Sequence, residues 1–482
     1  MKNKIYFSRT PLEYTSNKKE YKLNSIQMKK INSAWKVALL ASLLIWGCKK
    51  QTVEDQAEIS NSPAEKAATT SNVVFGGTNT YVVFAWNDLG MHCLNPTYDK
   101  MVILPPYNNL KVQVVKRGKV PTVVTSGLTV TYSIDNNTYS AGKQNYGQFW
   151  TYAQKLFGIT LAPNIGLTGN GLSGKMKAET GFFSAEGIPV VPVYDNGVKD
   201  PYQQATITVK DAAGKIVATT KTVIPTSDEI NCAQCHGNST IDAFDDILTK
   251  HDKAHNTNLM GSKPVLCAKC HASPALGAPG DGSSKYLSQA IHGFHANKGA
   301  TCYNCHPGAS TKCSRSARHT AADGNCTTCH GSMANVASTI AAGRVPWVGE
   351  PNCVSCHKGV SGVETGTTLY KNAHGHGNLF CSACHGSPHA MVPSLNAKDN
   401  YQAIQYQGST RPVKSIGSCG VCHKSSRGDS DMKEFAEKHA GTSPEVKNAC
   451  YTCHTGITTE TAKWPHAYQW KDSGGNPKGV SD

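Results

Sequence analysis

The sequence is short of the features that mark several common protein classes. Its 19 cysteines in 482 residues are too few for a disulfide-dense scaffold, and the chain is far too long to be a small one. The apolar run Ala34–Gly47, AWKVALLASLLIWG, is too short for a confident membrane span. From residue 231 onward, long apolar periodicity is also missing. The length nevertheless allows two or three domains.

The few cysteines are strongly ordered, because 16 of the 19 fall into eight copies of C-x-x-C-H. Chance would place roughly 0.03 such motifs in a chain with this content of Cys and His. Two cysteines three positions apart reach the two vinyl groups of one porphyrin and form thioethers, and the next residue supplies an axial imidazole to the iron. Zinc sites and disulfides also use paired cysteines, but they leave the eight histidines unexplained. The sequence therefore predicts eight covalent haem c groups. The motifs are Cys232/Cys235/His236, Cys267/Cys270/His271, Cys302/Cys305/His306, Cys326/Cys329/His330, Cys353/Cys356/His357, Cys381/Cys384/His385, Cys419/Cys422/His423 and Cys450/Cys453/His454.

The N-terminal segment predicts export. Residues 1–47 have the length and apolar stretch of a signal peptide, and Ile45-Trp46-Gly47-Cys48 resembles a bacterial lipobox with Cys48 as the lipidated residue. Reading from Met28 gives a compact basic start, so Met28 is an alternative initiator. A simple uncleaved anchor, with Cys48 incidental, is the other interpretation. Residues 48–72 are polar and without period, which is typical of a flexible linker.

The formal net charge of +15 is a weak argument for nucleic-acid binding. Residues 1–47 hold nine Lys/Arg and two Glu, so loss of this segment leaves a charge of +8. Each ferric haem with two ionised propionates adds about −1, which brings the loaded protein close to neutral. We therefore expect no nucleic-acid partner.

Residues 73–226 are poor in cysteine and rich in Val, Thr, Tyr and Gly. The segments NTYVVFAW, NLKVQVV, SGLTVTYSI and ATITVK alternate or run apolar like strands, with little sign of helical periodicity. ATITVKDAAGKIVATTKTV predicts a hairpin with its turn near residues 211–214. We expect a β-sandwich, with an immunoglobulin-like plan as one option, that packs on the haem-binding part or spaces it from the membrane.

One stretch of this β-rich part, WNDLGMHC at residues 86–93, holds a histidine and a cysteine. Three interpretations remain open: a loop with a buried thiol, a disulfide between Cys93 and Cys313, and His92 as a haem ligand. The first two concern Cys93 and the third concerns its neighbour, so they do not all exclude one another.

Residues 227–482 are expected to form the octahaem cytochrome c domain. The span from Cys232 to His466 offers about 29 residues per haem, too little protein for an ordinary core around each group. The porphyrins themselves should form the core, wrapped by loops and short helices, with helices predicted at 242–250 and 431–438. The gaps between motifs are unequal, which indicates a serial array rather than a strict repeat.

The remaining histidines predict the sixth iron ligands. Eight haems need eight further ligands, and ten of the eleven other histidines lie in the haem-binding part, which favours bis-histidine ligation and low potentials. His255, His374 and His92 are reserves. The predicted distal ligands are His251, His292, His295, His319, His376, His389, His439 and His466.

The motifs and their flanking segments support a resemblance. IHGFHANKGATCYNCHPG, GHGNLFCSACHGSPHA, WNDLGMHC and LPPYNNL look like segments of multihaem c-type cytochromes of metal-reducing bacteria, and the similarity covers most of residues 80–470. The resemblance implies that the haems carry electrons from the periplasm to the cell surface and on to extracellular acceptors, with other periplasmic or outer-membrane cytochromes as redox partners.

Three function classes compete. An electron carrier with every iron six-coordinate is the first. A multihaem enzyme, resembling octahaem nitrite, hydroxylamine or tetrathionate enzymes, needs an open iron, which those families often mark with C-x-x-C-K; that motif is absent. A filament subunit is the third, and lipidation at Cys48 opposes free filament growth. We therefore expect a tethered outer-membrane carrier at the cell surface or in the periplasm, and not an enzyme.

Overall fold

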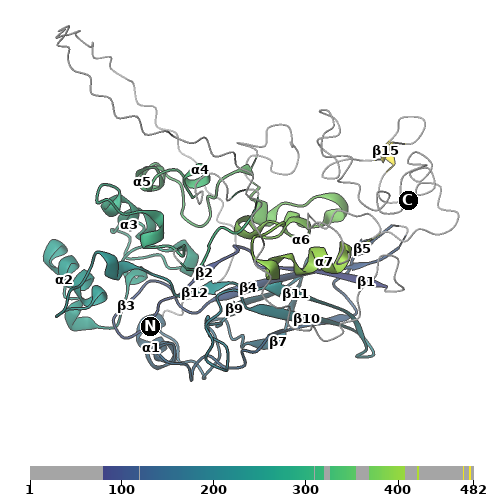
Figure 1. Cartoon of the computed structure of the whole chain (residues 1–482), viewed down its shortest axis with the longest axis horizontal. Coiled ribbons are helices and arrows are strands. Elements are labelled where there is room, and N and C mark those ends of the chain that lie inside the picture. The colour runs from purple at the N-terminus through teal and green to yellow at the C-terminus, as the bar shows by residue number, and fades with distance from the viewer. Residues whose placement is uncertain are drawn as a thin grey trace, which may run out of the picture. The chain divides into compact units, whose positions relative to one another are not determined.

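The structure of the protein, a computed structural model, describes part of the chain (Figure 1). The predicted signal segment, Met28, Cys48 and the linker 48–72 lie outside this part. The described residues are 80–118, 120–308, 310–317, 319, 326–353, 368–407, 421–422, 470–471 and 477–478.

Two antiparallel sheets make up most of residues 80–230. The first has the order β1 (Tyr81–Trp86), β4 (Asn108–Lys116), β9 (Phe182–Ile188), β8 (Lys177–Glu179), and β5 (Thr122–Val123) also pairs with β4. The second has the order β11 (Ile216–Val223), β10 (Gln204–Asp211), β6 (Leu128–Ile134), β7 (Ser173–Lys175). The chain is therefore β-rich in this part, and each of the four strand-like segments forms a strand.

The predicted hairpin is confirmed. β10 and β11 pair in antiparallel register, and the turn between them is closed by the bonds of Asp211 N–H to Lys215 O and of Gly214 N–H to Asp211 O, both 3.0 Å. Gly214 has φ +81°, a conformation that an L-residue adopts only with strain.

Both sheets contribute to one hydrophobic core. Val83 on β1, Val112 and Val114 on β4, and Ile207 and Val209 on β10 are each 0% exposed and belong to the same cluster of side chains. Burial alternates along β6 and β10, as expected for strands with one face turned inward, whereas β1 and β4 are buried along nearly their whole length. Burial of each such side chain contributes about 1.5–3 kcal/mol, so this core holds the two sheets together.

Three short strand pairs form separate two-stranded sheets in the described residues. β2 (His92–Cys93) pairs in parallel with β12 (Thr226–Ser227), and β3 (Met101–Val102) pairs in parallel with β13 (Val265–Leu266). β14 (Trp470–Lys471) pairs antiparallel with β15 (Pro477–Lys478). The β3–β13 pair joins the β-rich part to the segment that carries the C-x-x-C-H motifs.

A helix that the sequence analysis did not expect, α1 (Gln148–Phe157), lies within the β-rich part. It buries Phe149, Ala153 and Leu156, which recur at helical spacing, and it ends at Gly158 with φ +72°. Phe149 packs edge-on against Tyr98, with 5.4 Å between ring centroids. The expectation of little helical structure was therefore wrong here, because neighbouring aromatic residues obscured a short apolar stripe.

Short helices dominate the rest of the described chain. The predicted helix at 242–250 is confirmed as α2 (Ala243–His255), whose cap Asp242 accepts the N–H groups of Phe244 and Asp245. The helix predicted at 431–438 lies outside the described residues. The others are η1 (Cys232–Gln234), η2 (Met260–Ser262), η3 (Cys267–Lys269), η4 (Pro274–Leu276), α3 (Leu287–His295), η5 (Cys302–Asn304), α4 (Cys326–His330), α5 (Met333–Ala341), η7 (Tyr370–Asn372), η8 (His376–Asn378), α6 (Cys381–His385), η9 (Pro388–Ala390), η10 (Ala397–Asn400) and α7 (Tyr401–Gln407).

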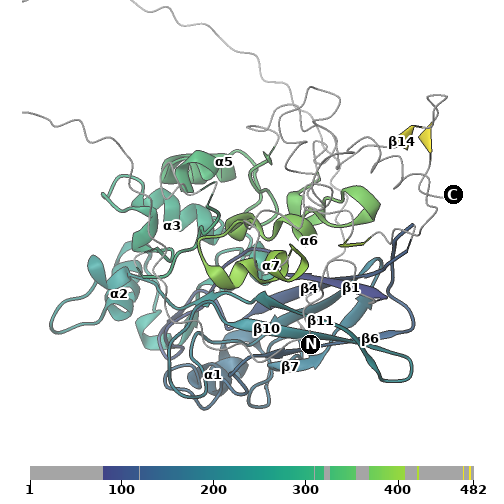
Figure 2. The same cartoon turned by 45° about the vertical axis from the view of Figure 1, so that its right-hand side comes forward.

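Helices α6 and α7 lie against the sheets, over β1 and β11 (Figure 2). β1 is an edge strand, and α7 satisfies its free backbone groups: Gln402 bonds both to the N–H and to the C=O of Ala85, and Tyr406 does the same at Val83. Trp86 packs on Phe380 just before α6, with ring centroids 5.4 Å apart. The β-rich part thus supports helices α6 and α7. These helices in turn cover the edge strand β1, which is not left open to pairing with another strand.

Candidate haem-binding sites

Each fully described C-x-x-C-H motif forms a single helical turn. These turns are η1, η3, η5, α4 and α6 with the residues that follow them. In the first three, the histidine N–H bonds to the carbonyl of the first cysteine at 2.8–3.0 Å. Residues three and four apart are neighbours on one side of a helical turn, so each turn brings the two cysteines and the histidine of its motif close together. Thioether attachment and axial ligation require these three residues near one another.

Four of the cysteines predicted to anchor haem lie at the surface. Cys235, Cys270 and Cys329 are exposed and are the second cysteines of their motifs, and Cys353, the first cysteine of its motif, is exposed as well. The first cysteines of the motifs of Cys235, Cys270 and Cys329 are half-buried, and burial raises the pKa of Cys267 to about 12. Haem attachment at these positions stays a prediction.

The other motifs are described only in part. Cys353 and Cys422 are described, while Cys356, His357, Cys419, His423, Cys450, Cys453 and His454 lie outside the described residues, as do the distal candidates His439 and His466.

Four motif histidines each face a second histidine at nearly the same distance. The separations of the ring centroids are 6.2 Å for His236–His295, 6.3 Å for His271–His251, 6.0 Å for His306–His292 and 6.1 Å for His330–His389.

That distance can be compared with the one an iron would impose. Two metal–nitrogen bonds of about 2 Å and two imidazole radii of about 1.1 Å put the centroids roughly 6.2 Å apart. The rings of His251 and His255, which are tilted by 52°, lie closer together, with centroids 4.8 Å apart. The four pairs therefore fit a metal held between two imidazoles.

The hydrogen bonds of these histidines fix the tautomer. The Nδ1–H of His271 donates to Lys285 O, that of His292 to Ser288 O and that of His295 to Ile291 O, at 2.7–2.8 Å. A carbonyl only accepts, so Nδ1 carries the proton and the lone pair of the neutral ring is on Nε2. Ligating histidines in metalloproteins commonly show this arrangement.

Three more of the paired histidines have a polar partner at Nδ1. His236 Nδ1 lies 3.2 Å from Asp246 Oδ2, His251 Nδ1 lies 3.0 Å from Thr257 Oγ1, and the Nδ1–H of His389 donates to Leu89 O at 3.0 Å. Burial lowers the pKa of His292, and it lowers that of His389 to about 4. Both rings are then neutral at pH 7, the form that binds metals.

Several motifs are close neighbours. Burial, and then the nearby Cys305, raise the pKa of Cys232 to about 11, and burial and Cys384 raise that of Cys422 to about 12. Burial and the nearby Cys302 likewise raise the pKa of Cys326. The structure thus brings together the motifs of His236, His306 and His330, and separately those of His385 and His423.

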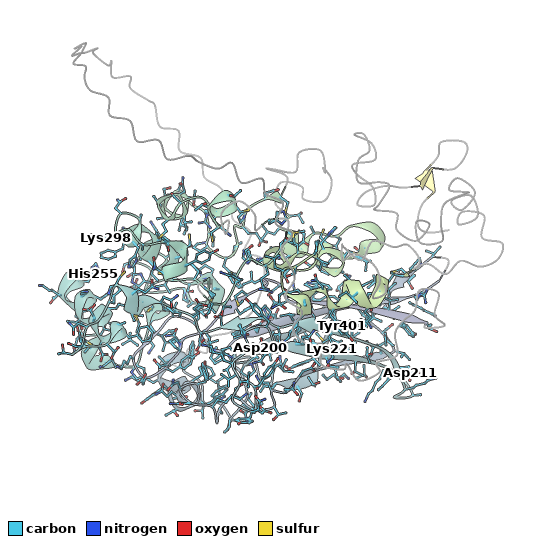
Figure 3. All side chains as sticks on the ribbon, in the orientation of Figure 1. Asp200, Asp211, Lys221, His255, Lys298 and Tyr401 are labelled. Carbon is cyan, nitrogen blue, oxygen red and sulfur yellow. The ribbon has the colours of Figure 1, made fainter. Side chains whose placement is uncertain are left out.

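Two other predicted ligands, His319 and His376, lie in the described residues. His319 is exposed, with Nδ1 3.2 Å from Ser316 Oγ. His376 lies on η8. Among the reserves, His255 is exposed at the end of α2 (Figure 3), and His374 packs on Phe380 with 4.0 Å between ring centroids.

His92 differs from the paired histidines in which nitrogen it uses. It is 7% exposed, and its Nε2 lies 3.3 Å from Asp88 Oδ1. Burial alone would raise the pKa of Asp88, but the hydrogen bond and charge of His92 hold it below the usual range. The nitrogen that the other histidines keep for a ligand is therefore engaged here.

Cys93 and Cys313, the cysteines of the described chain that belong to no motif, are free thiols in the structure. Burial and the proximity of Cys313 raise the pKa of Cys93, and burial raises that of Cys313 to about 11. Both are therefore protonated at pH 7. The two thiols are near each other without forming a disulfide.

Sequence reasoning missed the groups that orient the histidines. Lys285, Ser288 and Leu89 contribute backbone carbonyls, which carry no side-chain signal. His292 and His295 did carry a sequence signal, because residues three apart share a face of α3. That spacing does not predict that the two rings lie across from different motifs.

Comparisons of the chain with protein-family models, curated proteins and solved structures give no match. Within the described ranges, no group of three or more His, Cys, Asp or Glu side chains is placed to hold a metal ion; a haem iron takes only two ligands from the chain. No helix in the same ranges is long and apolar enough to cross a membrane.

Proposed function

We propose that the chain is an electron-transfer protein that holds c-type haems at its eight C-x-x-C-H motifs, each with a histidine on both sides of the iron. The observation that carries this proposal is the set of four histidine pairs with centroids 6.0–6.3 Å apart. A bound haem c supplies an iron that gains and loses one electron, and histidine in place of methionine keeps its potential low.

The chain's own residues have distinct roles in this proposal. The two cysteines of each motif anchor the group by thioethers, and the motif histidine gives the first axial imidazole. His251, His292, His295 and His389 give the second. The partners at Nδ1 of these four second histidines, and of His236 and His271, hold each of those rings in one tautomer and one orientation, so that Nε2 would face the metal without rearrangement.

The pairs favour a carrier over an enzyme. At the motifs of His236, His271, His306 and His330, a second imidazole lies where a substrate would have to bind. Electron transfer needs no open ligand position, whereas reduction of a nitrogen or sulfur oxyanion does. The proximity of Cys232 to Cys305, and of Cys326 to Cys302, also supports sites close enough to act as a chain.

The two sheets support a more specific architecture. We infer that they form a β-sandwich, since both contribute to one core, and that the octahaem domain follows it. The signal segment and Cys48 support an exported outer-membrane lipoprotein, with other redox proteins and extracellular acceptors as partners.

Intact mass and spectroscopy of the purified protein test the proposal. We expect eight covalent haems per chain, only low-spin signals by electron paramagnetic resonance when oxidised, and little carbon monoxide binding when reduced. Fewer than eight haems would overturn the stoichiometry. A stoichiometric high-spin haem with turnover of an oxyanion would replace the carrier by the enzyme.

A further inference from the structure

The loop after β1 is rigidly attached to the first sheet. Asn87 is 2% exposed, and its Oδ1 accepts the N–H groups of Leu89 at 3.0 Å and Gly90 at 2.6 Å. Its Nδ2 donates to Asn108 Oδ1 at 2.5 Å and to Asn109 O at 3.0 Å. The Nδ2 group of Asn87 thus attaches the loop to strand β4, and its Oδ1 stabilises the turn at Leu89 and Gly90.

The same loop contacts the segment that carries His389. Leu89 O accepts the Nδ1–H of His389 at 3.0 Å, and Ser387 Oγ–H donates to Asn87 O at 2.6 Å. Gly90 has φ +84°, and a Cβ added to it would lie 3.1 Å from the Cβ of His389 and 3.3 Å from that of Ser387. Only glycine allows the two backbones to approach so closely.

Arg315 ties both segments together. Its Nη1 donates to Gly90 O at 2.6 Å, and its backbone N–H donates to His389 O at 2.6 Å. The guanidinium is held by Asp399 through two bonds of 2.7 and 3.0 Å, and the residue is 1% exposed. The histidine is therefore restrained through its ring and through its backbone.

His389 differs from the other second histidines in this respect. His292 and His295 bond to carbonyls four residues earlier in their own helix, and His251 bonds to a residue six positions away. The acceptor for His389 is 300 positions away, on the β-rich part. Among the four described pairs, this is the one whose orientation depends on the sheets.

We propose that the loop Asn87–Gly90 is the positioning element for His389, and that through it the β-rich part sets the axial ligation of the haem at Cys326–His330. The inference rests on the proposed function, because it takes His389 as a ligand. Leu89 O fixes the proton on Nδ1, the close approach at Gly90 fixes the ring position, and Arg315 holds the two together. The β-rich part is then a tuning element for one haem in addition to a support.

The test compares spectra of the haem-loaded protein and its variants. His389→Ala identifies the signal, since one of eight low-spin haems should become high-spin and bind one carbon monoxide. Gly90→Ala should change that same signal, by altered g values or conversion to high spin, and should shift one midpoint potential. Gly214→Ala is the matched control: its φ is +81°, and nothing lies within 4 Å of an added Cβ. It should leave all eight signals unchanged.

Ser387→Ala gives a milder second variant in case Gly90→Ala does not fold. It removes the bond to Asn87 O and should shift the g values of the same haem without loss of ligation. The inference is overturned if His389→Ala produces its high-spin haem while Gly90→Ala and Ser387→Ala leave that signal as in the wild type. If His389→Ala itself changes no signal, the pairing of His330 with His389 fails, and the inference fails with it.

Discussion

Replacement of His292 by alanine tests the ligand pairing most directly. The ring of His292 lies across from that of His306, with an interplanar angle of 21° and a centroid separation of 6.0 Å. Removal of this imidazole should leave one iron with a single protein ligand. We expect the low-spin signal by electron paramagnetic resonance to fall by one-eighth, one high-spin haem to appear, and one carbon monoxide to bind per chain.

Among the described residues, the nearest histidine on the same helix is not expected to replace the lost ring. His295 lies three residues further along α3, about 4.5 Å along the helix axis, and it faces His236 at 6.2 Å. The helix itself should survive, because alanine has a higher helix propensity than histidine by about 0.5–0.7 kcal/mol. The total haem content should therefore stay at eight.

His255→Ala is the matched control for this variant. The histidine that it removes is exposed. Its ring centroid lies 4.8 Å from that of His251, closer than the separation of about 6 Å in the four pairs. All haems should stay low-spin. A His292→Ala protein that stays wholly low-spin, or a His255→Ala protein that gains the high-spin haem, would refute the assignment of ligands from ring separations.

Three further predictions concern stability and anchoring. Tyr406→Phe removes the hydroxyl bonded to both backbone groups of Val83 and should lower the free energy of unfolding by about 1–3 kcal/mol; a loss below about 0.5 kcal/mol in denaturant titration, relative to exposed Tyr139→Phe, would contradict it. Arg315→Ala leaves the Asp399 carboxylate buried without its main partner and should cost about 3–5 kcal/mol, against no measurable change for the exposed Lys215→Ala. Cys48→Ala should release the protein from membranes with its haems intact; continued membrane binding would favour an uncleaved anchor.

The sequence determined the features that depend on residues close together in the chain. A C-x-x-C-H motif needs only one helical turn to align its groups, so it predicts attachment chemistry without any knowledge of the fold. The strands β1, β4, β6 and β10 and the helix α2 were also predictable, because alternation and a capping Asp242 are local signals. Helix α1 was missed, because its buried face consists of only three residues and the half-buried aromatic residues beside them hide the helical spacing.

Only the tertiary structure decided which histidine faces which motif. His292 and His295 are three residues apart, yet they face the motifs of His306 and His236. His389 follows His385 by four residues but faces His330. The ring centroids of two imidazoles that bind one metal must lie about 6 Å apart. That separation depends on how the segments carrying the two histidines pack against each other. For His389, it depends on a glycine loop 300 residues earlier, a relation that no local pattern records.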